Sequence, residues 1–166
     1  YDPLREFDLV VQGQTAGFNV ITVPSKTTFR IDRDRLQFNV TSSRDGFVYV
    51  LLRSTEGGFM LLLPNDHARA NTIKAGQTLT LPPSSWPLDV AGPPGTDEFL
   101  VVVSASPRDF ARTGVKNEQG IGRFPSAGTS TAPGATSAYG GEPKCKSGAE
   151  CSTDYGATRF SVTETR

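Results

Sequence analysis

The residues that most constrain the fold form one stretch, 36–65, in which two turn signals separate three short apolar segments. In the first segment apolar and polar residues alternate, which is the pattern of a strand with one buried face. The second, 47–53, is apolar on both faces and is typical of a central strand. The third, 59–63, ends at Pro64, which has no N–H for a ladder. We expect the three strands to pair as an antiparallel meander, with Gly46 adopting a positive φ in the first turn.

Similar apolar segments recur along the rest of the chain between glycines and prolines. Further strands are expected at residues 7–12, 18–23, 27–32, 78–81, 86–91 and 99–104. The last of these is β-branched and apolar on both faces, which places it centrally in a sheet. One short helix is predicted after it, with Ser106 as its N-cap, Pro107 in its first turn and an end before Gly114.

The segment 120–143 differs from the rest in composition, because most of its residues are Gly, Ala, Ser, Thr or Pro. Such a segment buries too little apolar surface to offset the entropy that it would lose on ordering. Apolar alternation then returns with Phe160 and Val162. We expect a single domain over residues 1–166, with 120–143 as a flexible inserted loop and 155–164 as a returning C-terminal strand.

Short strands with regular turn signals indicate an all-β protein. We expect an immunoglobulin-like antiparallel β-sandwich with one short helix and the long Gly/Ser/Thr/Pro loop. A small β-barrel is the alternative. The chain holds 17 Lys and Arg against 17 Asp and Glu, so its formal net charge is zero. Nucleic acid is therefore excluded as the main partner, because such sites need clustered positive charge.

The longest apolar runs, 59–63 and 99–103, are far shorter than the ~20 residues that span a bilayer, so no transmembrane segment is expected in this chain. The sequence opens with Tyr-Asp-Pro and lacks an apolar leader. We expect a processed product or an excised domain of a larger protein.

The two cysteines, Cys145 and Cys151, have five residues between them and lie in a polar segment. Zinc normally takes four ligands, and a redox pair is usually spaced C-x-x-C. We expect one local disulfide, which implies an oxidising compartment. Two free thiols in a cytosolic loop are the alternative.

No catalytic, metal-binding or cofactor-binding motif is present, so no enzyme activity and no cofactor are predicted. A catalytic triad would have to use His67, the only histidine, which is better explained as a surface-loop residue. Loops on rigid β scaffolds commonly carry binding residues. The residues expected in partner-binding loops are Asn65, Asp66, His67, Asn71 and Tyr139.

The order of several motifs resembles a bacterial domain family of unknown function. Asp-Gly-Phe-Val-Tyr-Val at 45–50 is followed by Leu-Pro-Asn at 63–65 and Gly-Pro-Pro-Gly-Thr-Asp-Glu at 92–98. The resemblance covers about residues 18–112. The family occurs as a C-terminal domain of membrane-anchored serine/threonine kinases and in envelope and type VI secretion-associated proteins.

This resemblance implies a non-catalytic, periplasmic or otherwise extracytoplasmic module. We expect it to serve in interaction or sensing within a larger bacterial envelope or secretion-associated protein, and to bind a protein partner or an envelope component. The alternative function is an envelope hydrolase acting on a glycan or a peptide. Asp or Glu pairs facing a deep pocket would favour that alternative.

Overall fold

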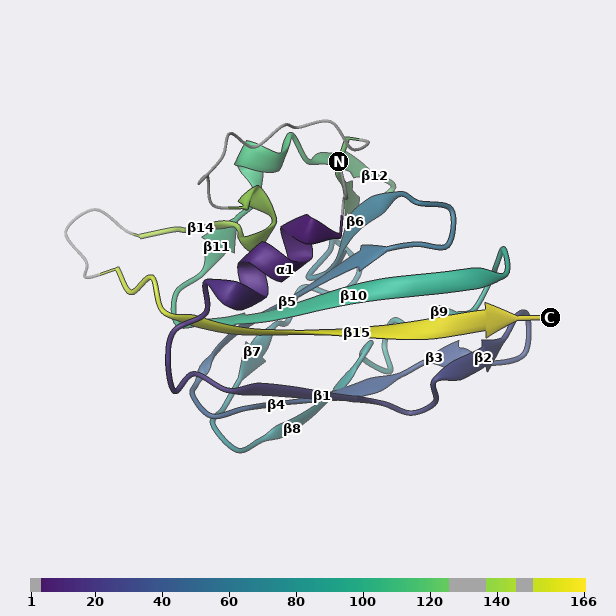
Figure 1. Cartoon of the computed structure of the whole chain (residues 1–166), viewed down its shortest axis with the longest axis horizontal. Helices are drawn as coiled ribbons and strands as arrows, with labels where there is room; N and C mark the ends of the chain where they lie inside the picture. Colours follow the sequence, from purple (N-terminus) through teal and green to yellow (C-terminus); the bar gives the residue numbers. More distant parts are fainter. Residues whose placement is uncertain (1–3, 126–136, 146–150) are drawn as a thin grey trace.

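A large sheet runs through the middle of the molecule and carries a further layer on each face (Figure 1). The computed structural model describes residues 4–125, 137–145 and 151–166. The strand order of the large sheet is β12-β13-β6-β5-β10-β15-β2, and β7 also pairs with β5. Its strands are β2 (Thr28–Arg30), β5 (Gly46–Arg53), β6 (Phe59–Leu63), β7 (Thr72–Ile73), β10 (Gly95–Ser104), β12 (Lys116–Glu118), β13 (Ile121–Arg123) and β15 (Tyr155–Thr165).

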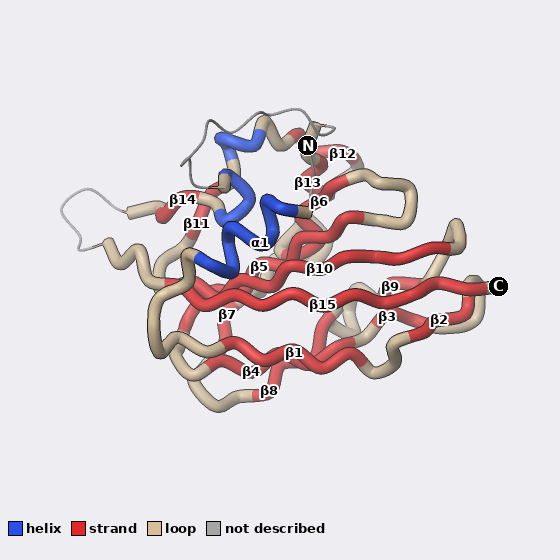
Figure 2. The backbone as a smooth tube through the Cα atoms, in the orientation of Figure 1, coloured by secondary structure: helices blue, strands red, loops and turns tan. Residues whose placement is uncertain are grey.

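A smaller sheet of order β1-β4-β8 covers one face of the large sheet. Its strands are β1 (Val20–Pro24), β4 (Phe38–Ser42) and β8 (Thr78–Leu81). Two short pairs complete the strands: β3 (Arg35–Leu36) with β9 (Leu88–Asp89), and β11 (Arg108–Asp109) with β14 (Glu142–Pro143). The described strands form separate sheets and no closed barrel (Figure 2), so the expected all-β sandwich is confirmed.

The other face of the large sheet is covered by α1 (Arg5–Gln12) and by two 3₁₀ helices, η1 (Ala111–Thr113) and η2 (Ala138–Gly140) (Figure 2). Two apolar cores result. The sheet-side core lies between the two sheets and includes Phe18, Phe29, Phe38, Val40, Val48, Val50, Phe99, Val101, Val103 and Val162. The helix-side core consists of Phe7, Val10, Tyr49, Leu51, Phe59, Leu100, Val102, Phe110, Phe124, Tyr139 and Ala157.

The two segments predicted to be apolar on both faces, 47–53 and 99–104, form the central strands β5 and β10 of the large sheet. β5 lies between β6 and β10, and β10 lies between β5 and β15. Successive side chains of a strand point to opposite faces. Val48 and Val50 therefore enter the sheet-side core, while Tyr49 and Leu51 enter the helix-side core. The prediction of two-sided burial is confirmed.

The returning C-terminal strand also belongs to the large sheet. β15 pairs antiparallel with β10 from Tyr155–Ser104 to Glu164–Gly95. Near its end it pairs in parallel with β2, where Thr163 lies beside Thr28. The alternation around Phe160 and Val162 therefore predicted a true strand.

The expected three-stranded meander is wrong in its first pairing. β5 and β6 form the predicted hairpin, but β4 pairs with β1 and β8 in the small sheet. The chain crosses between the sheets after Ser42, whose hydroxyl donates to the carbonyl of Arg44 at 2.7 Å and bends the connection. Alternation shows that one face of a strand is buried but does not say which sheet it joins.

Gly46 does not adopt the positive φ that was expected in the first turn. A glycine is needed here for another reason. A Cβ at this position would lie 2.6 Å from the carbonyl oxygen of Ser104 on the neighbouring strand. The glycine therefore permits a close approach of β5 to the end of β10.

The strand expected at residues 7–12 is instead the helix α1. Phe7 and Val10 are buried and lie three residues apart, which is the spacing of one helix face. The short run with two adjacent valines also fits a strand, so the pattern was ambiguous. Contact with the large sheet and η2 selects the helix.

The helix predicted to start at Ser106 is shorter and begins later. Residues 108–109 form β11, and the helical turn that follows is the 3₁₀ helix η1. Its N-cap residue is Phe110, which makes no side-chain cap. The carboxylate of the preceding Asp109 accepts a hydrogen bond from the N–H of Ala111 at 3.1 Å. The turn ends as expected at Gly114, which has a φ of 76°.

The described ends of the predicted loop 120–143 contain β13, η2 and β14. The remainder of that prediction falls on residues 126–136, outside the described part of the chain.

Candidate functional site

A cavity of about 310 Å³ opens at the end of the sandwich where β5 turns into β6. Its wall is largely apolar and includes Leu52, Met60, Phe99 and Val162, all of them in or packed against the sheet-side core. The turn after β5 and the segment from Leu88 to Gly92 border it. A concave apolar site of this size is within the range of small-ligand pockets.

Two carboxyl groups, those of Asp97 and Glu164, face each other in the wall of this cavity. Asp97 lies on β10 opposite Val162, and Glu164 lies two residues further along β15 on the same face. Their side chains are buried, with exposed fractions of 7% and 9% for the two residues. Strand register thus brings together two acids that are far apart in the sequence.

Each acid is also held by a backbone N–H from a turn. The Asp97 carboxyl accepts a hydrogen bond from the N–H of Thr55 at 3.0 Å. The Glu164 carboxylate accepts one from the N–H of Gly92 at 2.9 Å. The pair therefore connects the turn after β5 to the segment before β10.

The pKa of Asp97 is raised to about 8, mostly by burial and also by the hydrogen bond and the charge of Glu164. The N–H of Thr55 acts against this shift. Near neutral pH Asp97 therefore carries a proton that it can donate to the Glu164 carboxylate.

This arrangement is suited to holding two turns together more than to catalysis. A glycosidase separates its two carboxyl groups by about 5–9.5 Å to admit the sugar or a water molecule. Glu164 instead lies close enough to Asp97 to raise the pKa of Asp97 through a hydrogen bond and through its charge. Their bonds to Thr55 and Gly92 use further acceptor positions on both groups.

The charged residues at the rim are mostly engaged in ion pairs. Asp89 lies 3.1 Å from Arg35, and Arg123 lies 3.3 Å from Glu118. These exposed pairs limit the charge that the rim presents to a ligand. The cavity is therefore best matched to an apolar group.

Two larger cavities, of about 520 and 490 Å³, have less defined walls. The first is bordered by Ser137 and Pro143, close to segments that the structure does not describe. The second lies among prolines near β8 and is bordered by Lys26 and Arg35, which are both in ion pairs. Neither combines a core-lined wall with buried polar groups.

The four predicted binding residues of loop 65–75 make contacts within the protein. The Asn65 side chain accepts hydrogen bonds from the N–H groups of His67 and Ala68 and donates to the Leu62 carbonyl. His67 lies 2.8 Å from the Gln119 carbonyl and stacks on Trp86. These contacts fix the loop.

The other two residues of that loop are also bonded internally. Asp66 accepts a hydrogen bond from the Asn117 side chain at 2.9 Å, and Asn71 donates to the Val48 carbonyl at 3.1 Å. None of the four borders the 310 Å³ cavity. Their contact with a partner stays a prediction.

Tyr139 lies apart from that loop, in the helix-side core. It is 6% exposed, stacks on Phe59 with ring centroids 5.4 Å apart, and contacts Phe7 edge-on. Its ring therefore anchors η2 to the large sheet. Tyr49 is likewise buried, and Trp86 is partly buried against the sheet-side core.

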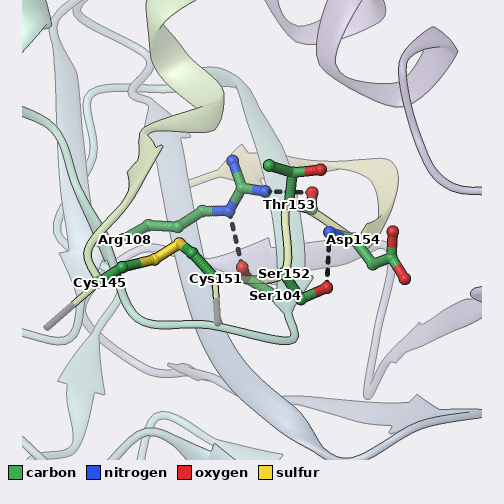
Figure 3. The surroundings of a disulfide bond; sticks show 7 residues. All are labelled: Ser104, Arg108, Cys145, Cys151, Ser152, Thr153 and Asp154. Carbon is green, nitrogen blue, oxygen red and sulfur yellow. Dashed lines mark hydrogen bonds between the residues drawn. A yellow bond between two sulfur atoms is a disulfide. The ribbon is translucent and has the colours of Figure 1, made fainter. Parts of the chain in front are cut away.

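Cys145 and Cys151 form the expected disulfide (Figure 3). Next to it, Arg108 gathers several segments of the chain. Its guanidinium donates to the Ser104 hydroxyl at 2.7 Å and to the Thr153 carbonyl at 2.8 Å, and it lies over the Tyr155 ring. The structure therefore fixes the chain on the C-terminal side of the disulfide to the end of β10.

Reasoning from the sequence missed both members of the acid pair. A signal for Glu164 was present, because it continues the alternation of Phe160 and Val162 on the buried face. Asp97 lies before the strand expected at 99–104, whereas β10 begins at Gly95. A buried acid in each of two neighbouring strands would have predicted the pair.

In the described part of the chain, no cluster of three or more His, Cys, Asp and Glu side chains is placed to hold a metal ion. Among the same residues, no helix has the length and apolar character needed to cross a bilayer.

Comparison with known proteins gives one result. No curated protein and no solved structure matches the chain. Residues 28–107 are similar to a domain family of unknown function, DUF4384, which agrees with the resemblance to a family of unknown function noted from the motifs.

Proposed function

We propose that this chain is a non-catalytic interaction or sensing module of a larger bacterial envelope or secretion-associated protein, and that its 310 Å³ cavity receives an apolar group of a protein partner or an envelope component. The cavity is the observation that carries this proposal. Its wall is continuous with the sheet-side core, so the surrounding strands hold it open. Preformed apolar sites of this kind bind with little reorganisation.

The acid pair supports a binding role for the cavity. Because Asp97 and Glu164 satisfy each other and accept backbone N–H groups, they fix the two turns at its mouth. A ligand would then meet a defined opening without having to order it. The bound group itself would interact chiefly with apolar side chains such as Met60 and Leu88.

The Cys145–Cys151 disulfide supports an extracytoplasmic location, because structural disulfides persist in oxidising compartments. The kinase and secretion setting comes from the family resemblance alone. The proposed location is the periplasm.

Filling the cavity tests the proposal. Wild type, Met60→Trp, Met60→Leu and Leu79→Trp would be used as baits in a pull-down from a bacterial envelope extract. Met60→Trp should lose the partner, because the indole occupies the cavity, whereas Met60→Leu should retain it. Leu79→Trp is the matched control, since Leu79 packs on the same core but does not border the cavity. Equal capture by all four proteins would show that the cavity is not the binding site.

One observation favours the alternative hydrolase: the Asp97–Glu164 pair borders a pocket, and hydrogen-bonded acid pairs also perform peptide hydrolysis. Asp97→Asn and Glu164→Gln separate the two functions. A hydrolase would lose release of fragments from peptide or glycan substrates in both variants. A binding module would show no such release in the wild type.

A further inference from the structure

The 310 Å³ cavity has more acidic than basic residues in its wall. Among the described residues that line it, the acids are Glu56, Asp89, Asp97 and Glu164, and the one base is Arg123. The guanidinium of Arg123 is already engaged, because it forms an ion pair with Glu118. A single engaged arginine therefore leaves an excess of acidic groups in the wall.

Two of these acids, Asp97 and Glu164, are buried without a cation beside them. They are only 7% and 9% exposed, and within the described ranges no ion pair joins either of them to a lysine or an arginine. The backbone N–H groups that they accept are neutral. Such hydrogen bonds satisfy an acceptor but do not cancel a charge, and an ionised acid that is buried without a cation is costly.

Each of the two acids also keeps one oxygen for a further donor. The N–H of Thr55 reaches Oδ1 of Asp97, and the N–H of Gly92 reaches Oε1 of Glu164. Oδ2 of Asp97 and Oε2 of Glu164 accept no hydrogen bond from any described N–H group. An ammonium group carries three N–H donors and one positive charge, so it supplies both what these oxygens accept and the charge that the pair lacks.

We propose that the cavity takes the side chain of a lysine from the protein partner, with the ammonium group at the Asp97–Glu164 pair and the aliphatic stem along the apolar wall. This inference rests on the proposed function and names the group that the cavity would receive. A lysine buries its flexible four-carbon stem readily against apolar side chains while its charged end meets polar groups. Leu52, Met60 and Phe99 offer such a surface to the stem.

A lysine matches the site better than other cations. Calcium takes about 6–8 oxygen ligands, of which two carboxyl groups in an otherwise apolar wall supply few. An arginine binds best when its planar guanidinium reaches both oxygens of one carboxylate. The N–H groups of Thr55 and Gly92 already occupy one oxygen of each acid, which disfavours that arrangement. A compact ammonium group needs only the remaining oxygens.

Binding of a cation at the pair should also displace a proton. At about pH 7 the free protein keeps Asp97 protonated, because its pKa is raised to about 8. An ammonium group beside Asp97 favours the ionised carboxylate and so lowers this pKa. The ammonium group stays charged, since its own pKa is about 10.4. The proton therefore passes from Asp97 to the buffer.

The other titratable groups near Asp97 are mostly acids. They are Glu164 on β15, Glu98 on β10, Glu56 in the turn after β5, Asp89 on β9 and Arg123 on β13. Glu98 is held in an ion pair by Arg159. The charges of Glu164 and Glu98 raise the pKa of Asp97, so they favour the protonated form until a cation arrives.

Isothermal titration calorimetry with hexylamine and 1-hexanol tests the requirement for a charge, because the two probes share one stem. Wild type at about pH 7 should bind hexylamine at least about tenfold more tightly than 1-hexanol. The heat of hexylamine binding should differ between HEPES and phosphate buffers, which take up the released proton with different enthalpies. Equal affinities would overturn the lysine inference and leave the proposed binding of an apolar group intact. Binding of neither probe up to about 10 mM would overturn both.

Variants of the pair locate the ammonium group. Asp97→Asn with Glu164→Gln removes both charges at nearly constant shape, so it should bind the two probes equally, and its binding of 1-hexanol shows that the cavity is intact. Asp97→Asn alone should abolish the buffer dependence. Asp89→Asn is the matched control, because Asp89 borders the same cavity but is exposed and paired with Arg35, and it should bind hexylamine within about twofold of wild type. A double variant that still prefers hexylamine would reject the pair as the site.

Nα-acetyl-lysine methylamide and its arginine counterpart identify the source of the cation. The lysine derivative should displace hexylamine from wild type, and the arginine derivative should need at least about tenfold higher concentrations. Equal displacement by the two derivatives would reject the preference for lysine. Hexylamine that binds but is not displaced by the lysine derivative would assign the site to a free amine and overturn the lysine inference.

Discussion

The two faces of the large sheet are covered in different ways. The sheet-side core is closed by the strands β1, β4 and β8, which lie between residues 20 and 81. The helix-side core is closed by α1 near the N-terminus and by segments around Phe110, Phe124 and Tyr139. One cover is a continuous sheet with its own ladder, whereas the other is assembled from separate pieces. Stability on the second face should therefore depend on individual contacts.

The family match sharpens this difference. Residues 28–107 include β4, β5, β8 and β10 but leave out α1, β15 and every helix-side residue after Val102. The matched region alone would expose Tyr49, Leu51, Leu100 and Val102. Both cores therefore contain residues from outside the matched region, on its N-terminal and its C-terminal side.

The largest effect is expected from restricting the chain to the matched residues. A fragment of residues 28–107 should not unfold cooperatively, because it lacks β15 between β10 and β2 and leaves one face of the sheet bare. Residues 4–166 should show a sigmoidal thermal transition by circular dichroism. A cooperative transition of equal size in the fragment would show that the helix-side cover is dispensable.

Matched Phe→Ala substitutions compare the two cores directly. Phe99 and Phe7 are 1% and 0% exposed, and each makes aromatic contacts in its own core. We expect Phe99→Ala to lower the free energy of unfolding by about 4–5 kcal/mol and Phe7→Ala by about 3 kcal/mol. The smaller loss reflects α1, which can shift to fill part of the space. Urea unfolding measures the free energy of unfolding of both variants. A larger loss for Phe7→Ala than for Phe99→Ala would contradict the expectation that the helix-side core tolerates the substitution better.

Arg108 is the main polar tie on the helix side. Replacement by Gln should cost about 2 kcal/mol, because the carbonyls of Gly140, Gly141 and Thr153 lose their common donor. The control is Arg112→Gln, which breaks an exposed ion pair with Glu142 and should cost less than about 1 kcal/mol. Equal costs in urea unfolding would mean that Arg108 contributes no more than a surface arginine.

Because of the Asp97–Glu164 pair, the stability of the sheet-side core should depend on pH more strongly than that of the helix-side core. Because the pKa of Asp97 is raised from 3.8 to about 8 on folding, the folded protein holds an extra proton between these values. This proton stabilises the folded protein fully below about pH 4, and the stabilisation is lost as the pH rises through about 8. The side chain of Asp97→Asn is neutral at every pH. Between pH 5 and 9 the free energy of unfolding of this variant should exceed that of wild type by about 1–2 kcal/mol, after allowance for solvent screening.

Thermal unfolding across this range measures the effect, with Asp89→Asn as the control. Asp89 is an exposed rim carboxylate in a surface ion pair, so its replacement should leave the pH profile of wild type unchanged. A profile for Asp97→Asn that runs parallel to wild type would show that the acid pair does not carry the pH dependence.

The sequence predicted the strands better than their partners. Residues 47–53 and 99–104 read as central strands because two-sided apolar runs require cover on both faces, and the structure provides it. The pairing of β4 was missed because its alternation is equally satisfied in either sheet. Helix α1 was missed because six apolar-rich residues do not distinguish a strand from one face of a helix.

The candidate site was harder to foresee than the fold. The cavity lies where the ends of several strands come together. A local sequence pattern cannot predict which distant segments will be neighbours there. Asp97 and Glu164 come together only through the register of β10 with β15. The disulfide between Cys145 and Cys151 was predictable, since it is local and involves both cysteines of the chain.

The parallel pairing of β2 with the end of β15 has a consequence for the time course of folding. Thr28 finds its neighbour Thr163 only when almost the whole chain is present. Loop closure over such a separation is slow, so proteins rich in these contacts fold in milliseconds to seconds. During synthesis the large sheet must remain incomplete until the C-terminal residues emerge. Until Thr163 to Thr165 have been made, β2 has no neighbour in the large sheet, because β15 is the strand that joins β2 to β10.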